Sequence, residues 1–283
     1  MVVCYVKNES SVVPVDSPFR YPGGKSWLVR DIVSEITRLK RPPRLFLEPF
    51  AGGASVALAV GAYGLSDKIL LVEKDPNVAA VWRTILGPNS EWLARRIIEF
   101  DINRDSVEQM LASKPHSIRH LAFLTLLRNR VTHGGVLSAT GGLLKNGERG
   151  NGVSSRWYPV TLATRIRKIA LLRDRMSFIE GDGMEYLRKH SQSKTTCMFV
   201  DPPYTERGKQ AGLRLYNESE VDHEEIFRVC QRGRATAFLT YDDNALIRKL
   251  ARRYGFGFRK VQMRSTHHKV HDELFLVAHG GRT

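Results

Sequence analysis

The chain has 283 residues, of which 42% are hydrophobic, and this length suits one α/β core that carries an insertion. Lys and Arg number 44 against 29 Asp and Glu, so the formal net charge is +15 and a polyanion, nucleic acid first, is the expected partner. Three widely separated cysteines support neither a disulfide framework nor a zinc site, and no signal peptide or apolar run of about 18 residues is present, so we expect a cytoplasmic protein without membrane contact.

The first part of the chain alternates between short apolar strands and helices. Strands are predicted at residues 45–47 and 69–72, and helices follow them at residues 54–64 and 78–86. This alternation is typical of a parallel sheet. Helical patterns then continue without an intervening strand, at residues 91–100, 106–111, 118–130 and 161–173.

Strands resume in the last third of the chain. They are predicted at residues 176–179, 196–200 and 235–240, with helices at 220–232 and 244–254 and a closing hairpin at 256–263 and 273–278. We therefore predict an α/β fold with a Rossmann-like sheet domain, made of residues 18–86 and 176–283 after an N-terminal tail of residues 1–17. A mainly helical insertion spans residues 87–175.

Positive charge is concentrated in this insertion. Between Lys114 and Arg175 there are 12 basic residues and 2 acidic ones, which gives a local net charge of +10. Trp157 and Tyr158 either stack on displaced bases or belong to the core. Contacts to DNA are predicted from Arg128, Asn129, Arg130, Lys145, Arg149 and Arg156, and the alternative is a solvated basic face.

The most specific motif is Asp201-Pro202-Pro203-Tyr204, directly after the predicted strand at residues 196–200. Proline fixes φ and lacks an N–H group, so a Pro-Pro step is stiff and leaves carbonyl oxygens free to accept hydrogen bonds. The carboxylate of Asp201 adds a second acceptor, and Tyr204 adds a stacking face. The four residues therefore predict a site for a flat base with an exocyclic amine, and the alternative is an ordinary turn after a strand.

A glycine-containing loop follows the first strand, in the segment from Glu48 through Phe50, Gly52 and Gly53 to Ser55. Glycines at this point let the backbone approach a ligand closely. The spacing lacks a diphosphate-binding fingerprint, while the second strand ends in Glu73-Lys74-Asp75, where related folds hold a ribose. The combination favours a nucleoside cofactor without phosphates, with S-adenosylmethionine as the leading candidate.

Two further motifs fall at the same expected sheet edge. An aromatic turn with a lysine, Phe19-Arg20-Tyr21-Pro22-Gly23-Gly24-Lys25, precedes a helical pattern, and Glu180-Gly181-Asp182 ends another strand. Read singly, they are a helix-entry turn and a solvated turn. A later cluster, His267, His268, His271 and Asp272, is interpreted as a polar loop, so no metal site is predicted.

The order of these motifs resembles the Dam-like, α-class family of N6-adenine DNA methyltransferases. The resemblance covers residues 19–77 and 176–278, and it implies S-adenosylmethionine as cofactor. By resemblance, Phe50, Gly52 and Gly53 line its methionine side and Asp182 lies near its adenine. Many relatives read D-x-N after the second strand, so Glu73 and Asp75 both remain candidates for the ribose, and Glu73 is favoured as the first acid after the strand. The remaining implied cofactor contacts are Tyr21, Gly23, Gly24, Lys25, Glu48 and Asp201.

The activity implied by the resemblance is transfer of a methyl group to N6 of an adenine flipped out of duplex DNA. Asp201 and the Pro202 carbonyl would accept from the amino group, with Pro203 and Tyr204 completing the site. Relatives that methylate GATC carry a different stretch where this chain has residues 128–135, so the recognised sequence stays open, as does a cognate restriction endonuclease. The alternatives are an RNA N6-adenine methyltransferase and a non-catalytic basic DNA-binding module.

Overall fold

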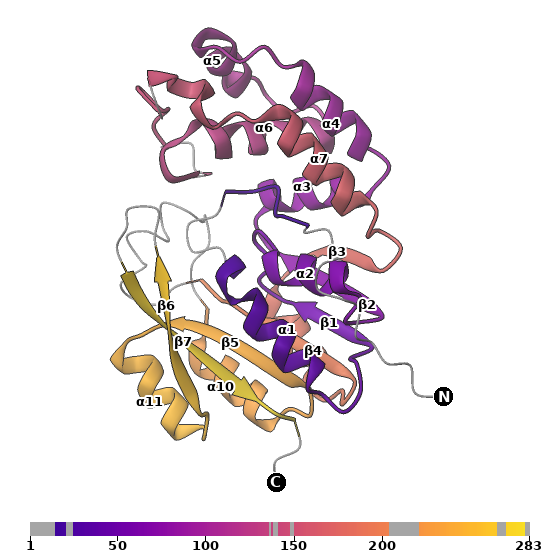
Figure 1. Cartoon of the computed structure of the whole chain (residues 1–283), viewed down its shortest axis with the longest axis vertical. Helices are drawn as coiled ribbons and strands as arrows, with labels where there is room; N and C mark the ends of the chain where they lie inside the picture. The colour runs from indigo at the N-terminus through magenta and orange to yellow at the C-terminus, as the bar shows by residue number, and fades with distance from the viewer. Residues whose placement is uncertain are drawn as a thin grey trace.

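The computed structural model describes residues 15–20, 25–135, 137, 141–147, 150–203, 221–264 and 270–280. Within these residues seven strands form one sheet with the order β3-β2-β1-β4-β5-β7-β6 (Figure 1). The strands are β1 (Leu45–Glu48), β2 (Lys68–Glu73), β3 (Met176–Glu180), β4 (Thr196–Val200), β5 (Thr236–Asp242), β6 (Phe258–Arg264) and β7 (Val270–Ala278).

The first five strands run parallel, and the last two close the sheet as an antiparallel hairpin. In the centre, Phe46 of β1 lies opposite Ile69 of β2 and Cys197 of β4. At the other end β7 pairs antiparallel with both β5 and β6, with Glu273 opposite Asp242 and Val261. The predicted α/β class with a Rossmann-like parallel sheet and the predicted hairpin are confirmed.

Helices cover both faces of the sheet, because successive strand residues point to opposite sides. Phe46 belongs to one buried cluster, and its neighbour Leu47 belongs to another. The cluster around Phe46 includes α1 (Val29–Thr37), α2 (Ser55–Tyr63) and α3 (Pro76–Leu86). The cluster around Leu47 includes α8 (Gly183–His190), α10 (His223–Arg232) and α11 (Ala245–Arg253).

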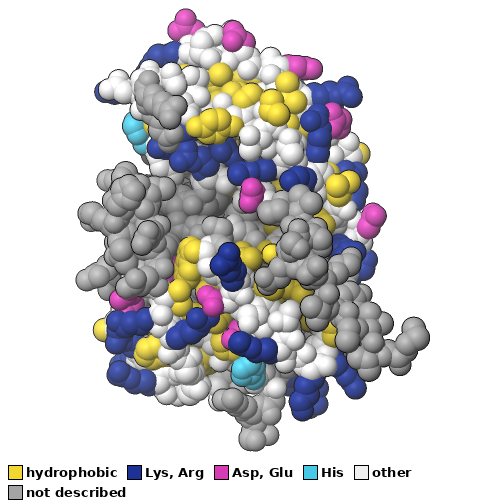
Figure 2. All heavy atoms as spheres, viewed as in Figure 1, with side chains coloured by type: hydrophobic (Ala, Val, Ile, Leu, Met, Phe, Trp, Pro, Cys, Tyr) yellow, Lys and Arg dark blue, Asp and Glu magenta, His cyan; other side chains and the backbone are white. Residues whose placement is uncertain are grey.

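Residues 90–170 form a helical lobe that lies at one end of the molecule, beyond α3 (Figure 1). Lys and Arg side chains gather along the side of this lobe that faces the sheet (Figure 2). The helices of the lobe are α4 (Ser90–Glu99), α5 (Arg104–Ala112), α6 (Ile118–Val131) and α7 (Pro159–Ala170), and short 3₁₀ turns lie at His133–Gly135 (η3) and Gly152–Arg156 (η5).

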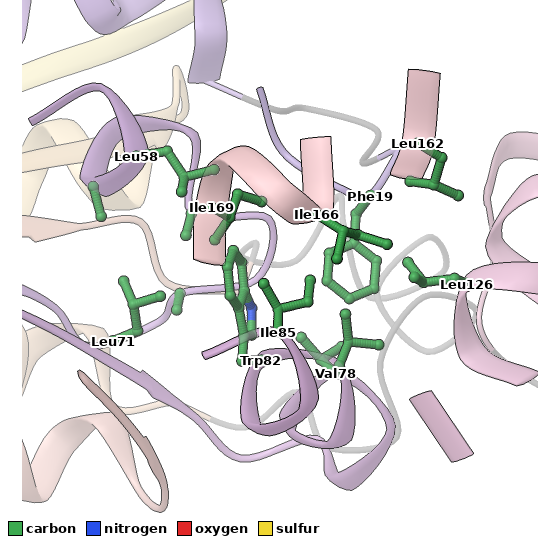
Figure 3. Close-up of a cluster of buried hydrophobic side chains, with 14 of the residues drawn as sticks. Phe19, Leu58, Leu71, Val78, Trp82, Ile85, Leu126, Leu162, Ile166 and Ile169 are labelled. Atoms are coloured by element: carbon green, nitrogen blue, oxygen red, sulfur yellow. The ribbon is translucent and has the colours of Figure 1, made fainter. Parts of the chain in front are cut away.

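The lobe and the sheet share one hydrophobic core. Trp82 of α3 is fully buried, with Leu71 of β2 on one side and Ile166 of α7 nearby (Figure 3). Phe19, from the segment before the first helix, packs against Trp82 with ring centroids 6.3 Å apart. Helix α3 therefore belongs to both parts, and the lobe packs against the sheet domain through apolar side chains.

Most predicted elements are present with ends shifted by a few residues. Helix α1 matches the helical pattern after Lys25, and the one helix that the sequence does not predict among those described is α8. The side chain of Asp182 begins α8 by accepting a hydrogen bond from the N–H of Met184, 3.0 Å away. No described helix is long and apolar enough to cross a membrane.

Candidate active site at the carboxyl ends of the strands

Acidic residues end three neighbouring parallel strands and meet at one edge of the sheet. Glu48 is the last residue of β1, Glu73 the last residue of β2, and Asp201 directly follows β4. The strand order places β1 between β2 and β4. Ligands of open α/β sheets bind at this carboxyl edge, and the change of direction in strand order falls between β1 and β4.

Asp201 is held through both carboxylate oxygens. Its Oδ2 lies 2.9 Å from the Nζ atom of Lys25, and its Oδ1 accepts a 2.7 Å hydrogen bond from the hydroxyl of Thr240 on β5. Lys25 and Thr240 are buried, while the side chain of Asp201 keeps 26% of its surface exposed. The carboxylate is therefore fixed from the protein side and open to a ligand on the other side.

Two further carboxyl groups lie close to this pair. Glu48 accepts a 2.9 Å hydrogen bond from the N–H of Ala57 in the first turn of α2, and burial raises its pKa well above the ordinary value. Glu273 on β7 lies 3.6 Å from the Nζ atom of Lys25, and burial raises its pKa to about 7. The charge of Lys25 therefore acts on several carboxyl groups, and burial disfavours the charged forms of Glu48 and Glu273.

The loop after β1 is tied to the end of β2. Gly52 has φ +44°, in the left-handed region that favours glycine, and its N–H donates a 2.9 Å hydrogen bond to Glu73 Oε2. Its carbonyl oxygen accepts from the indole N–H of Trp82, also at 2.9 Å. Ala54 has φ +49°, which is strained for a residue with a side chain. The loop is therefore held in a specific, strained shape.

Glu73 and Asp75, the two candidates for a ribose contact, have different roles in the structure. Glu73 Oε1 accepts hydrogen bonds from the N–H groups of Lys74 and Asp75, at 2.8 and 3.0 Å, while Oε2 accepts only that of Gly52 among the described residues. Asp75 caps α3 by accepting from the N–H of Asn77 at 2.8 Å. Glu73 is thus the acid that joins the glycine loop, and Asp75 is used to begin a helix.

The other sequence-predicted residues of this site lie at the same edge where the structure describes them. Pro202 is buried, Pro203 and Gly53 are partly exposed, and Asp182 is exposed at the start of α8. Phe50 packs beside Gly183, where an added Cβ atom would lie 2.9 Å from the Phe50 ring. Tyr21, Gly23, Gly24 and Tyr204 lie outside the described residues.

Among the predicted DNA contacts, Asn129 and Arg130 need a correction. Asn129 is 1% exposed and bonds both backbone groups of Arg20, accepting at 2.8 Å and donating at 3.0 Å, while Arg130 Nη2 donates to the Pro18 carbonyl at 2.7 Å. Both side chains are used inside the protein, because they fasten residues 18–20 to the lobe. They are unavailable to DNA in this arrangement.

Lys145 is exposed, and Arg128 and Arg156 are partly exposed, while Arg149 lies outside the described residues. Trp157 is a core residue that makes edge contacts with Phe100 and Phe123, whereas Tyr158 is 54% exposed. Of the later histidine cluster, His271 and Asp272 lie in β7 and not in a loop, because the strand begins at Val270, while His267 and His268 lie outside the described residues. Asp272 pairs with Lys260 at 3.5 Å, and no group of three or more metal-ligating residues is found within the described ranges.

Three residues of the site were not predicted from the sequence: Thr240, Glu273 and Trp82. Glu273 carries a visible signal, because it is an acid directly before the apolar run Leu274-Phe275-Leu276 of a predicted strand. Buried acids are rare unless they are paired, so such a position is a candidate for a functional contact. Thr240 and Trp82 carry no comparable signal, since both suit a strand or a core.

Comparisons with known proteins give only distant likenesses. No family model and no curated protein matches the chain. Among solved structures, a precorrin-6y C5,15-methyltransferase from Geobacter metallireducens is 11% identical over 88% of this chain and 85% of that chain, with a TM-score of 0.38. A putative RNA methyltransferase from Pyrococcus horikoshii is 10% identical over 93% and 87%, with a TM-score of 0.40. A putative class I S-adenosylmethionine-dependent methyltransferase from Listeria monocytogenes is 10% identical over 99% of this chain and 66% of that chain, with a TM-score of 0.42. At these TM-scores the likenesses assign no activity.

Proposed function

We propose that this chain is an S-adenosylmethionine-dependent methyltransferase of the Dam-like family that modifies N6 of adenine in duplex DNA. The observation that supports this most directly is the Asp201 carboxylate, held by Lys25 and Thr240 beside Pro202 and next to the glycine loop. A rigid acceptor pair beside a nucleoside site is what activation of an exocyclic amine requires.

The residues at the sheet edge fit a positively charged nucleoside without phosphates. Glu73 keeps acceptor capacity on Oε2 for a ribose hydroxyl, Gly52 brings the backbone close, and Asp182 is exposed beyond β3. An acidic neighbourhood also suits a sulfonium cation. S-adenosylmethionine supplies an electrophilic methyl group when bound at this edge.

The chemistry of the chain itself is hydrogen-bond acceptance at the target amine. The lone pair of adenine N6 is delocalised into the ring, so the nitrogen is a weak nucleophile. Acceptance of its two N–H groups by Asp201 and the Pro202 carbonyl favours tetrahedral geometry and localises the pair on nitrogen. Lys25 and Thr240 keep the carboxylate aimed while this happens, so positioning and electrostatics contribute most of the rate.

The helical lobe is the proposed DNA-contacting part. Its basic side, seen in Figure 2, faces the sheet domain that carries Asp201. Lys145, Arg128 and Arg156 are the described residues retained for phosphate or base contacts, and Arg149 stays in the proposal on sequence alone. A flipped base would leave the duplex toward Asp201, with Tyr204 as the proposed stacking residue.

Methyl incorporation by Asp201→Ala tests this function. We expect the variant to lose transfer into duplex DNA by at least about 10³-fold while DNA binding is retained, because Asp201 contacts the amine and not the phosphates. The matched control is Asp67→Ala, an exposed aspartate just before β2, at the opposite edge of the sheet.

Three outcomes count against the proposal. Methyl transfer into an RNA substrate but not into DNA would favour the RNA methyltransferase. Absence of a thermal shift with S-adenosylmethionine would contradict the cofactor. Full activity of Asp201→Ala would remove the role given to the carboxylate.

A further inference from the structure

Glu273 is a buried acid that the proposed function does not yet use. It lies on β7 between Asp242 of β5 and Val261 of β6, and it is 3% exposed. Neither carboxylate oxygen has a hydrogen-bond partner among the described residues. Burial of a carboxylate without hydrogen bonds lowers the free energy of unfolding, so stability alone does not explain a Glu at this position.

Lys25 connects Glu273 to Asp201. Its Nζ atom lies 2.9 Å from Asp201 Oδ2 and 3.6 Å from Glu273 Oε2. The second distance is an ion pair beyond hydrogen-bond length, and a movement of the ammonium by under about 1 Å closes it to the 2.7–2.9 Å typical of charged hydrogen bonds. Lys25 therefore links the partly exposed carboxylate of Asp201 to the buried carboxylate of Glu273.

The groups that face Glu273 keep it ready to bind a proton. Burial raises the pKa of Glu273 to about 7. The positive charge of Lys25 lowers this pKa, whereas the negative charges of Asp201 and Asp242 raise it. Val261, its partner on β6, is apolar. Near neutral pH, Glu273 can therefore either hold a proton or release it.

Transfer of a methyl group to an amine releases one proton. The new C–N bond forms as the C–S bond breaks, which leaves a neutral thioether, and one N6–H proton must depart for the ring to recover its conjugation. We propose that this proton passes from N6 to Asp201, that Lys25 takes it while donating one of its own to Glu273, and that Glu273 stores it until release of the products. The inference rests on the proposed function.

The geometry favours Glu273 over the other buried acid for this task. Glu48 already accepts a hydrogen bond from the N–H of Ala57, and burial raises its pKa well above the ordinary value. Asp201 must accept again at each turnover and therefore has to lose its proton quickly. Glu273 acts through Lys25 and is a positioning residue rather than one that touches the substrate.

Single-turnover methyl transfer by Glu273→Gln, measured against pH, tests the inference. In the unaltered protein we expect the rate to rise as pH passes through about 7, because the acceptor must lose its proton first. Glu273→Gln is expected to lower the rate at high pH about tenfold and to abolish the rise of the rate around pH 7, while binding of DNA and of S-adenosylmethionine changes less than twofold. The control is Asp272→Asn, since Asp272 directly precedes Glu273 in β7 but pairs with Lys260. This variant should keep the rise around pH 7.

A second measurement is independent of activity. Carbon-13 NMR of the Glu side-chain carboxyls should show one titration near pH 7 that is absent in Glu273→Gln and moves upward in Lys25→Met. An unchanged pH profile in Glu273→Gln, or the absence of any carboxyl titration near pH 7 that Glu273→Gln removes, overturns the inference. An unaltered protein that methylates no adenine while the NMR titration is present would instead contradict the proposed function.

Discussion

The hydroxyl of Thr240 donates a 2.7 Å hydrogen bond to Asp201 Oδ1, so a buried strand residue orients the exposed carboxylate. Thr240→Val keeps the shape and removes the donor. A hydrogen bond to a charged group contributes about 1.5–3 kcal/mol, so kcat for methyl transfer should fall about 10- to 100-fold. Thr240→Ser keeps the hydroxyl and should stay within about threefold of the unaltered protein. Equal rates for Val and Ser would contradict the prediction.

Gly183 lets the start of α8 lie against the loop after β1. A Cβ atom there would overlap the carbonyl oxygen of Pro49 and lie 2.9 Å from the Phe50 ring. Gly183→Ala should therefore shift the loop and weaken S-adenosylmethionine binding at least about tenfold by calorimetry. The control is Gly181→Ala, where the nearest heavy atom to the added Cβ would lie at an ordinary 3.4 Å. Equal affinities for the two variants would refute the prediction.

Asn129 makes two hydrogen bonds to Arg20, which fasten the segment before the first helix to the lobe, and one of 2.9 Å to the Gly135 carbonyl within the lobe. Asn129→Ala leaves these buried backbone groups without partners, and we expect a loss of about 3 kcal/mol in the free energy of unfolding. Asn129→Asp has the same shape but lacks the donors, so it should be at least as harmful. A loss below about 0.5 kcal/mol in urea unfolding of either variant would disprove the role.

The ion pairs of Asp243 should make the free energy of unfolding depend on pH in the acidic range. Arg248 and Lys260 bind its carboxylate, with Arg248 Nη2 at 2.6 Å and Lys260 Nζ at 3.0 Å, and they hold its pKa at about 2. A lowered pKa stabilises the fold above the ordinary value near 4, and this contribution disappears as pH falls toward about 2. The unaltered protein should exceed Asp243→Asn by about 1 kcal/mol at neutral pH, with the difference shrinking below about pH 4. Urea unfolding across this range checks the trend, and a constant difference would contradict it.

The sheet was readable from the sequence because a buried parallel strand needs an unbroken apolar run, such as residues 196–200. The placement of Glu48, Glu73 and Asp201 at one edge followed from the parallel order of their strands. Helix α8 escaped prediction because its eight residues are mostly polar and begin with a glycine that reads as a turn.

The features that the sequence does not predict depend on contacts between residues that are far apart along the chain. Asn129 lies between two arginines in the sequence, which suggests a nucleic-acid contact. In the structure the oxygen and the nitrogen of its side-chain amide both form hydrogen bonds with the backbone of Arg20, 109 positions earlier. Glu273 stands out in the sequence as an acid at the start of an apolar run, but its partner Lys25 is known only once the first helical turn is placed against its strand. Local patterns assign elements, while the partner of a polar side chain depends on the tertiary fold.

Trp82 has a mechanical consequence. Its ring is packed between the lobe and the sheet, and its N–H holds the carbonyl oxygen of Gly52. Under the proposed function, a tilt of the lobe on a bound duplex would displace the indole and with it the loop beside Glu73. DNA binding by the lobe and cofactor binding at the loop would then be coupled through Trp82.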